Sequence, residues 1–329
     1  MSIHLQSSSI ATQAYRPPAF EPSARPLPGP AQTPAPSTLP YRPEPSWHPQ
    51  LAQLMPQQGQ GTGGVSFDAQ VRGQDAKQID LELMQISQAV YDPATESVGN
   101  WTRVSDADLA AAGIDPALME NPDTGFRAGI YTDGDGNHVL AFAGSNEFKD
   151  WTGANLRQGL GWQAEQYDEA VQLAQLAAGA YGDDLVITGH SLGGGLAATA
   201  SFATGNAAVT FNASGVHDNT IRNLNLDVDT AKADAEGGQI RRYNVDGDPL
   251  TTAQQDTWVV KHGLPDAPGH EITLDSPYPP LEGPEWTWNP VEYAKRVTEH
   301  GKAKLERAGE LHSQQGVIDA LTQQRPWES

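Results

Sequence analysis

The sequence has 329 residues, of which 38% are hydrophobic and 19% are charged, enough for one domain with a sizeable core and unstructured extensions. Its formal net charge of −21 disfavours nucleic-acid binding and offers no overall attraction to anionic lipid headgroups, so any membrane contact has to be apolar and local. The chain contains no cysteine and forms no disulfides, which suits both cytosolic folding and export of an unfolded chain.

Residues 1–58 are rich in proline, alanine, serine and glutamine without a periodic apolar pattern, which predicts a disordered arm. Residues 59–73 are typical of a flexible joint, so the predicted division is an arm with its linker at 1–74 and a folded domain at 75–329. The first residues, MSIHLQSSSIATQ, lack the basic and apolar regions of a signal peptide. We therefore expect export, if any, by a non-Sec route, and no membrane anchor.

Helical and strand patterns alternate along the folded domain, which implies an α/β fold with a mostly parallel central sheet flanked by helices. Two β runs joined by the glycine-rich turn DGDGN predict a hairpin. The predicted helices cover residues 75–91, 163–181, 290–308 and a short stretch after Ser313, and the predicted strands cover 126–131, 138–143, 185–188, 207–212, 239–245 and 270–274.

The most informative stretch is LVITGHSLGGGLA at residues 185–197, where an apolar run leads into a G-x-S-x-G turn and then into small residues that continue as a helix. This strand–turn–helix pattern lifts a serine hydroxyl clear of the sheet, and glycine is needed two positions to either side because larger side chains would clash. Ser191 is therefore the candidate nucleophile. The backbone N–H of Leu192, at the start of the helix, is a candidate oxyanion donor.

A serine nucleophile needs a histidine base and a carboxylate to orient it, and in this architecture they follow in the order Ser, Asp, His. The carboxylate should follow the end of a strand. Asp248, in the sequence NVDGDPLT, meets this requirement, and its neighbours Gly247 and Pro249 brace it in a turn. Asp246, two residues nearer the strand, is the alternative acid.

Three histidines remain candidates for the base. His312 follows the last strand and precedes Ser313, a plausible helix N-cap, so it enters the site from the correct end of the sheet. His270 is the alternative, although it begins its strand and therefore lies at the opposite end. His300, on a polar helix, ranks third.

The second oxyanion donor is expected from the loop that ends the hairpin, in the sequence FAGS, where glycine permits close approach and Ser145 offers its N–H. Apolar residues between this loop and the next helix, Trp151, Leu156, Leu160 and Trp162, would suit a lid over the site or a simple cover for the core.

These motifs together resemble the lipase class 3 family and its bacterial phospholipase relatives: VLAFAGSNEFKDW, QYDEAVQLA, LVITGHSLGGGLAA, VTFNASG and the GDPLT turn. The resemblance implies an α/β-hydrolase fold with Ser191 as nucleophile, Asp248 as acid and Gly144-Ser145 at the oxyanion hole. Some relatives place the histidine just before a strand, as at His270, and bacterial relatives often place it before a V-I-x-A-L helix, as at His312. The sequence departs from the family at Ala143, where arginine is common.

The sequence therefore predicts a serine carboxylic-ester hydrolase that acts on glycerolipids at a bilayer, a phospholipase A or lipase delivered as a bacterial secreted effector. No metal or organic cofactor is implied. The expected partners are a phospholipid or other acyl-ester lipid, a transient membrane contact and a secretion chaperone or immunity protein, but no nucleic acid. A soluble esterase or thioesterase, and an effector whose hydrolase fold serves only for binding, are the alternatives.

Overall fold

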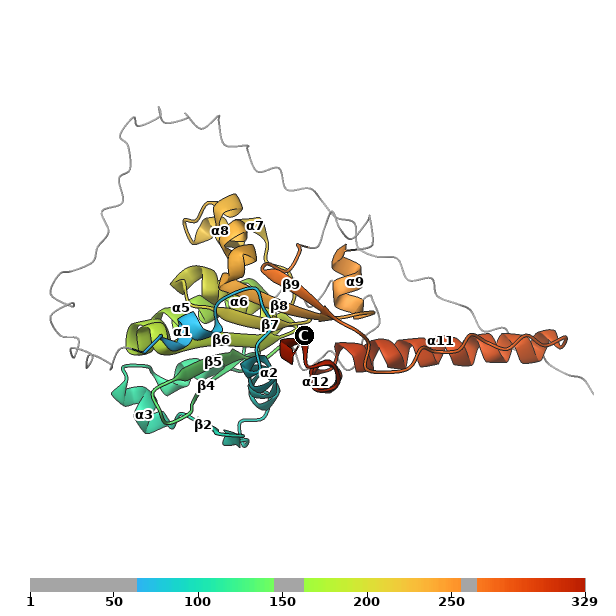
Figure 1. Ribbon diagram of the computed structural model, residues 1–329, viewed down its shortest axis with the longest axis horizontal. Coiled ribbons are helices and arrows are strands. Elements are labelled where there is room, and N and C mark those ends of the chain that lie inside the picture. Colours follow the sequence, from blue (N-terminus) through green and yellow to red (C-terminus); the bar gives the residue numbers. More distant parts are fainter. Residues whose placement is uncertain (1–63, 145–162, 256–264, 329) are drawn as a thin grey trace, which may run out of the picture. The chain divides into compact units, whose positions relative to one another are not determined.

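The computed structural model describes residues 64–144, 163–255 and 265–328 (Figure 1). These residues form a nine-stranded sheet in the order β1-β2-β4-β5-β6-β7-β8-β9, with β3 paired to β4 beside this path. The strands are β1 (Ser97–Val98), β2 (Trp101–Arg103), β3 (Glu120–Asn121), β4 (Phe126–Thr132), β5 (His138–Phe142), β6 (Leu185–His190), β7 (Ala208–Phe211), β8 (Ile240–Val245) and β9 (His270–Leu274).

The sheet is antiparallel at one edge and parallel from its centre onward. Strands β4 and β5 form the expected antiparallel hairpin, and every pairing from β5 to β9 is parallel. All six residues of β6 are buried, as is usual for a strand at the centre of a covered parallel sheet. The predicted α/β fold with a mostly parallel sheet is therefore confirmed.

Helices connect the strands and extend beyond the last one. The α-helices are α1 (Phe67–Val71), α2 (Ile79–Ala89), α3 (Asp106–Ala111), α5 (Gln163–Tyr181), α6 (Leu192–Thr204), α7 (Asp218–Asn223), α8 (Val228–Asp234), α9 (Pro249–Gln255), α11 (Pro290–His312) and α12 (Gln314–Gln324). Short 3₁₀ turns lie at Pro116–Met119, Gly182–Asp184 and Pro326–Glu328, and a π-turn lies at Ala235–Gln239.

Two hydrophobic clusters lie on opposite faces of the sheet, because successive side chains of a strand point to opposite sides. Leu140 and Phe142 of β5 pack with helices α5 and α6 in one cluster. Val139 and Ala141 of the same strand pack with α1, α2 and α12 in the other. Figure 1 shows α6 above the strands and α2 and α12 below them. The helices therefore cover the parallel part of the sheet on both faces.

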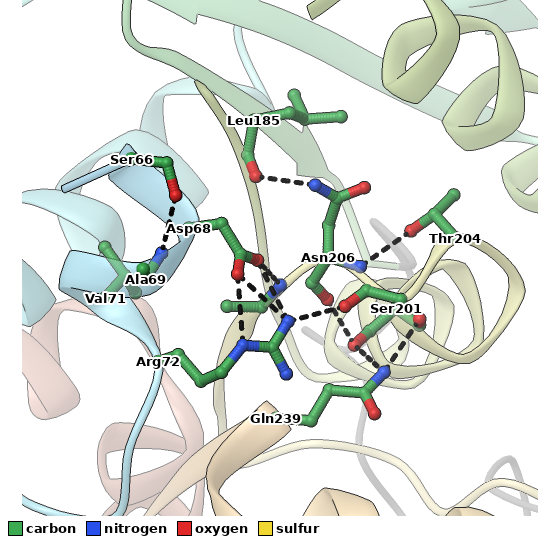
Figure 2. A network of polar contacts seen from close by, with 12 residues as sticks. Ser66, Asp68, Ala69, Val71, Arg72, Leu185, Ser201, Thr204, Asn206 and Gln239 are labelled. Carbon is green, nitrogen blue, oxygen red and sulfur yellow. Dashed lines mark hydrogen bonds and ion pairs between the residues drawn. The ribbon is translucent and has the colours of Figure 1, made fainter. Parts of the chain in front are cut away.

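Helix α1 lies in the stretch that the sequence assigned to the linker, yet it is part of the fold. Phe67 and Val71 are buried in the core. Asp68 accepts hydrogen bonds from the Arg72 guanidinium and from the backbone N–H of residue 207, and Arg72 donates to the carbonyl of Gly205 at 2.6 Å. Figure 2 shows this network between α1 and the turn after α6. Order therefore begins before residue 75, because paired polar groups anchor a short helix that lacks any long apolar period.

A buried ion pair fastens the next helix to the sheet. Arg241 of β8 and Asp80 of α2 are 1% and 0% exposed, and their side chains are in contact. Arg241 also donates to the carbonyls of Val71 and Gly73, and Tyr243 donates its hydroxyl to Asp80 at 2.6 Å. Each buried charge is therefore paired and further hydrogen-bonded, as burial requires.

Helix α11 is longer than expected. The polar pattern predicted an end near residue 308, but the helix continues to His312, and Ser313 ends α11 and caps the N-terminus of α12. His312 therefore lies in the last turn of a 23-residue helix. Within the described residues, no helix is both long and apolar enough to cross a bilayer.

Candidate active site

Ser191 lies in the sharp turn between β6 and α6. Its backbone has φ 60° and ψ −125°, a conformation that a non-glycine residue adopts only where the surroundings impose it. A Cβ on Gly189 would lie 2.1 Å from the carbonyl oxygen of Gly193, and one on Gly193 would lie 2.2 Å from that of Phe142. The two glycines are thus required by close backbone packing, as the pattern predicted.

Asp248 lies in the turn between β8 and α9 and is completely buried. Its Oδ2 accepts from the backbone N–H and the hydroxyl of Thr251, at 2.7 and 2.8 Å, as an N-cap residue does. These bonds orient the carboxylate and leave Oδ1 for another partner. Asp246, the alternative acid, is exposed, and its backbone N–H donates to the carbonyl of Leu274 at 2.7 Å.

His312 joins the serine to this carboxylate. Its Nδ1–H donates to Oδ1 of Asp248 at 2.6 Å, and its Nε2 accepts from the Ser191 hydroxyl at 2.9 Å. All three side chains are at most 5% exposed. His270 instead begins β9 and contacts Glu236 at 2.9 Å, and His300 is half-buried on α11. The structure brings together Ser191, Asp248 and His312, and leaves the other candidates apart.

Two buried side chains that the sequence analysis did not assign hold the end of α11 in place. His190, next to the serine, donates from Nε2 to the carbonyl of His312 at 2.7 Å. Burial, and then the nearby His312 ring, lower the pKa of His190 to about 3, so this imidazole is neutral at pH 7. Asn212 donates to the carbonyl of Leu311 at 3.0 Å. The backbone on either side of the His312 Cα is therefore tied to the sheet.

Asn212 also links the base to the acid turn. Its Oδ1 accepts from the N–H of Val245, the last residue of β8, at 3.0 Å, while its Nδ2 reaches Leu311. Asn212 is fully buried and has φ 41°, the left-handed region that asparagine tolerates better than most residues. An asparagine at the end of a predicted strand was the only sequence signal for this role.

The oxyanion side of the site is described in part. Leu192 is the first residue of α6, so its N–H has no acceptor within the helix and lies at the positive end of the helix dipole. The N–H of Gly144 donates to the Tyr91 hydroxyl at 2.7 Å, and burial raises the pKa of Tyr91 to about 12, which keeps it protonated. The backbone N–H of Gly144 is thus already bonded to Tyr91. Ser145, the other expected donor, lies outside the described residues, as do the four apolar residues for which a lid or a cover for the core was expected.

The chain belongs to a known family by direct comparison. A family model described as the Tle-like phospholipase domain matches residues 82–273, which include Ser191 and Asp248. The chain is also 44% identical over 259 residues to an extracellular phospholipase A1 of Serratia liquefaciens, covering 78% of this chain and 75% of the relative.

This chain is a member of the Tle-like phospholipase family. It is thus a lipid-ester hydrolase, and the predicted resemblance to bacterial phospholipases is confirmed. Among solved structures, a mutant form of MDLA from Penicillium cyclopium superposes with a TM-score of 0.38 at 19% identity, covering 66% of this chain and 86% of that one, which is too distant to support an argument.

Two other features of this phospholipase bear on ligands. A pocket of about 590 Å³ is lined by residues of α1, α2, the start of β2 and the hairpin turn, among them Trp101 and Asp135. That turn is at the amino end of β5, whereas Ser191 follows the carboxyl end of β6, so the pocket is not at the candidate site. In the part of the chain that the structure describes, no cluster of three or more His, Asp or Glu side chains is arranged to hold a metal ion.

Proposed function

We propose that this phospholipase cleaves the ester by a serine mechanism and removes the acyl chain at the sn-1 position. The observation that carries the mechanism is the hydrogen-bonded chain from Ser191 through His312 to Asp248. The sn-1 position is proposed because the relative at 44% identity is named a phospholipase A1.

In this mechanism His312 Nε2 takes the proton of the Ser191 hydroxyl as Oγ attacks the acyl carbonyl carbon. Asp248 accepts from Nδ1–H, holds the reactive tautomer and stabilises the imidazolium. The N–H of Leu192, together with Ser145, stabilises the negative charge that forms on the carbonyl oxygen. His312 then gives its proton to the departing lysophospholipid oxygen, and a water activated by the same histidine hydrolyses the acyl-enzyme.

We also infer that the protein acts outside the cell that makes it. Support comes from the extracellular relative and from the Pro-rich arm, whose composition suits an unfolded address for a specialised secretion machine or its chaperone. An effector with this activity would need an immunity protein or a chaperone in the producing cell and a transient membrane contact in the target.

The test uses purified full-length protein and Ser191→Ala. A fluorophosphonate probe should label the unchanged protein and not the variant, because it reacts with activated serines. On vesicles of a phosphatidylcholine with different sn-1 and sn-2 chains, mass spectrometry should find the sn-1 acid released first. The variant should keep less than about a hundredth of the activity.

Each alternative gives its own result. A soluble esterase or thioesterase would label with the probe and cleave short esters while leaving the vesicles intact. A fold that serves only for binding would neither label nor cleave. Release of the sn-2 acid with normal labelling would overturn the positional proposal alone.

A further inference from the structure

Helix α11 carries an apolar surface for which the described chain supplies no partner. Apolar and small residues recur three or four positions apart along one side, forming the α11 stripe: Val291, Ala294, Val297, Gly301, Leu305 and Ala308. This spacing places them on one face of a helix. Val291 is 77% exposed and Leu305 is 63% exposed. The same row of positions ends at His312, so the stripe leads directly to the candidate base.

The opposite side of α11 is already occupied by the chain. Arg296 pairs with Glu285, and Arg307 donates to the carbonyl of Pro279 and lies over the ring of Tyr278. The segment before the helix therefore runs along this side. The helix contacts α9 and α12 near its C-terminus, and Figure 1 shows the rest of it extending beyond the sheet. The stripe thus lies on the side of α11 away from the segment that precedes the helix.

Two tryptophans precede the exposed end of the helix. Trp286 and Trp288 are 60% and 89% exposed, and their rings pack edge to face with centroids 4.2 Å apart. Large aromatic rings are rarely left so exposed in water, and tryptophan is the side chain most enriched at the boundary between lipid headgroups and acyl chains. An apolar stripe with tryptophans at its end is the pattern of a helix that lies in a membrane interface.

The charges of α11 differ from those of the whole chain. The helix carries five basic and four acidic residues, a net charge of +1, whereas the chain carries −21. Lys302 and Lys304 flank the stripe on either side, and both are exposed without an ion-pair partner among the described residues. The arginines, in contrast, pair with acidic side chains on the other side. The stripe is thus an apolar band with free cationic edges on an otherwise acidic protein.

We propose that the α11 stripe is the face by which the enzyme docks on a bilayer that contains anionic phospholipid, with the exposed Trp286 and Trp288 entering the interface at the N-terminal end of the helix. The apolar side chains enter the interface, and the two lysines meet lipid phosphates. Since His312 ends the same helix, docking here brings the bilayer to the entrance of the candidate site. This inference rests on the proposed function, because it takes a bilayer lipid as substrate.

The first experiment measures binding in a Ser191→Ala background, so that the lipid stays intact. Flotation with phosphatidylcholine vesicles containing about a third phosphatidylglycerol should show binding, and Val291→Glu with Leu305→Glu should weaken it about tenfold or more. The matched control is Val65→Glu with Leu176→Glu, which introduces the same charge at exposed apolar positions away from α11 and should bind as before. Equal loss in both pairs, or no loss in either, overturns the proposal.

The second experiment tests the cationic edges. Lys302→Gln with Lys304→Gln should weaken binding to the anionic vesicles about tenfold or more, because each basic residue near such a surface contributes about fivefold in affinity. The two changes should leave binding to pure phosphatidylcholine unchanged. Equal binding of the unchanged protein to both kinds of vesicle would refute the preference for anionic lipid. If a stripe variant fails to fold, Trp288→Ala replaces it, because Trp288 is 89% exposed; weaker vesicle binding by this variant supports the proposal and unchanged binding refutes it.

The third experiment separates docking from catalysis. In the active protein, the ratio of vesicle hydrolysis to hydrolysis of a short soluble ester should fall about tenfold for the stripe variant and stay constant for the control pair. If the unchanged protein cleaves neither substrate, the proposed function has failed. If it cleaves both and the stripe variant keeps the ratio, only docking is refuted. If the unchanged protein is a dimer, and Leu305→Glu makes it a monomer that still binds vesicles, the stripe is the contact surface for a second copy of the chain. That result refutes the docking proposal.

Discussion

His312 makes the two hydrogen bonds that a base requires, while His270 lies at the other end of the sheet, on Glu236. Members of a catalytic triad act as a unit, so losing the true base should cost about as much as losing the nucleophile. We therefore expect His312→Ala to fall to the level of Ser191→Ala on a soluble ester, and His270→Ala to stay within about threefold of the unchanged protein. An inactive His270→Ala, with His312→Ala still active, would contradict the assignment.

His190 should make stability depend on pH. Its pKa is lowered to about 3 by burial and by His312, from an ordinary value of 6.5, so it is neutral in the folded state and protonated in the unfolded state between these values. Its contribution to the free energy of unfolding is complete above pH 6.5 and is lost as the pH falls toward 3. The expected loss approaches about 1.4 kcal/mol per pH unit.

The variant His190→Gln keeps a side-chain N–H that can reach the carbonyl of His312 but has no group that titrates. Urea unfolding at several pH values from about 7 down to 4 should show a shallower loss of stability in this variant, by about 1 kcal/mol per pH unit. Curves that run parallel across this range would show that His190 is protonated in the folded state.

At the scale of elements, the ion pair of Asp80 with Arg241 fastens α2 to β8 in the interior. Asp80→Ala leaves the guanidinium buried without its counter-charge, so the free energy of unfolding should fall by about 3–5 kcal/mol. Glu328→Ala, which removes an exposed ion pair with Arg325, should change it by less than about 1 kcal/mol. Chemical denaturation of both variants measures the difference.

A double variant tests whether the loss comes from the orphaned charge. Asp80→Leu with Arg241→Met removes both charges and should recover much of the stability lost in Asp80→Ala, because an apolar pair of similar volume carries no desolvation cost. A double variant less stable than the single one would mean that the additional hydrogen bonds to Tyr243, Val71 and Gly73 outweigh the ion pair itself.

At the scale of the whole molecule, the arm and the folded domain should be separable, but only at the right boundary. Deletion of residues 1–58 should leave hydrolysis of a soluble ester within about twofold, since the arm has no apolar pattern for a core. Deletion of residues 1–74 also removes α1 with buried Phe67 and Val71, and it should lower the melting temperature by several degrees. Equal melting temperatures for the two truncated proteins would show that α1 contributes nothing.

The arm should matter for delivery instead. In the native host, the protein without residues 1–58 should be made and folded but recovered in smaller amounts outside the cells than the full-length protein. Equal secretion of both would count against an address in the arm.

The local sequence pattern by itself determined the elbow, the alternation of strands and helices, and the order of the candidate residues. Gly189, Ser191 and Gly193 could be assigned because the steric conflict they avoid lies within a few residues of the chain. Helix α5 was found at its observed bounds for a similar reason, since an amphipathic period is a local signal.

Only the tertiary structure decided which histidine meets Ser191, because that contact joins residues 121 positions apart and depends on how α11 ends against the sheet. The same holds for Asn212, whose bonds reach Leu311 and Val245, and for α1, whose Asp68 and Arg72 bond to the backbone of the distant residues 207 and 205. Periodicity reports which side of an element is apolar. It does not report which distant polar group will satisfy a buried one, because that depends on packing of the complete chain.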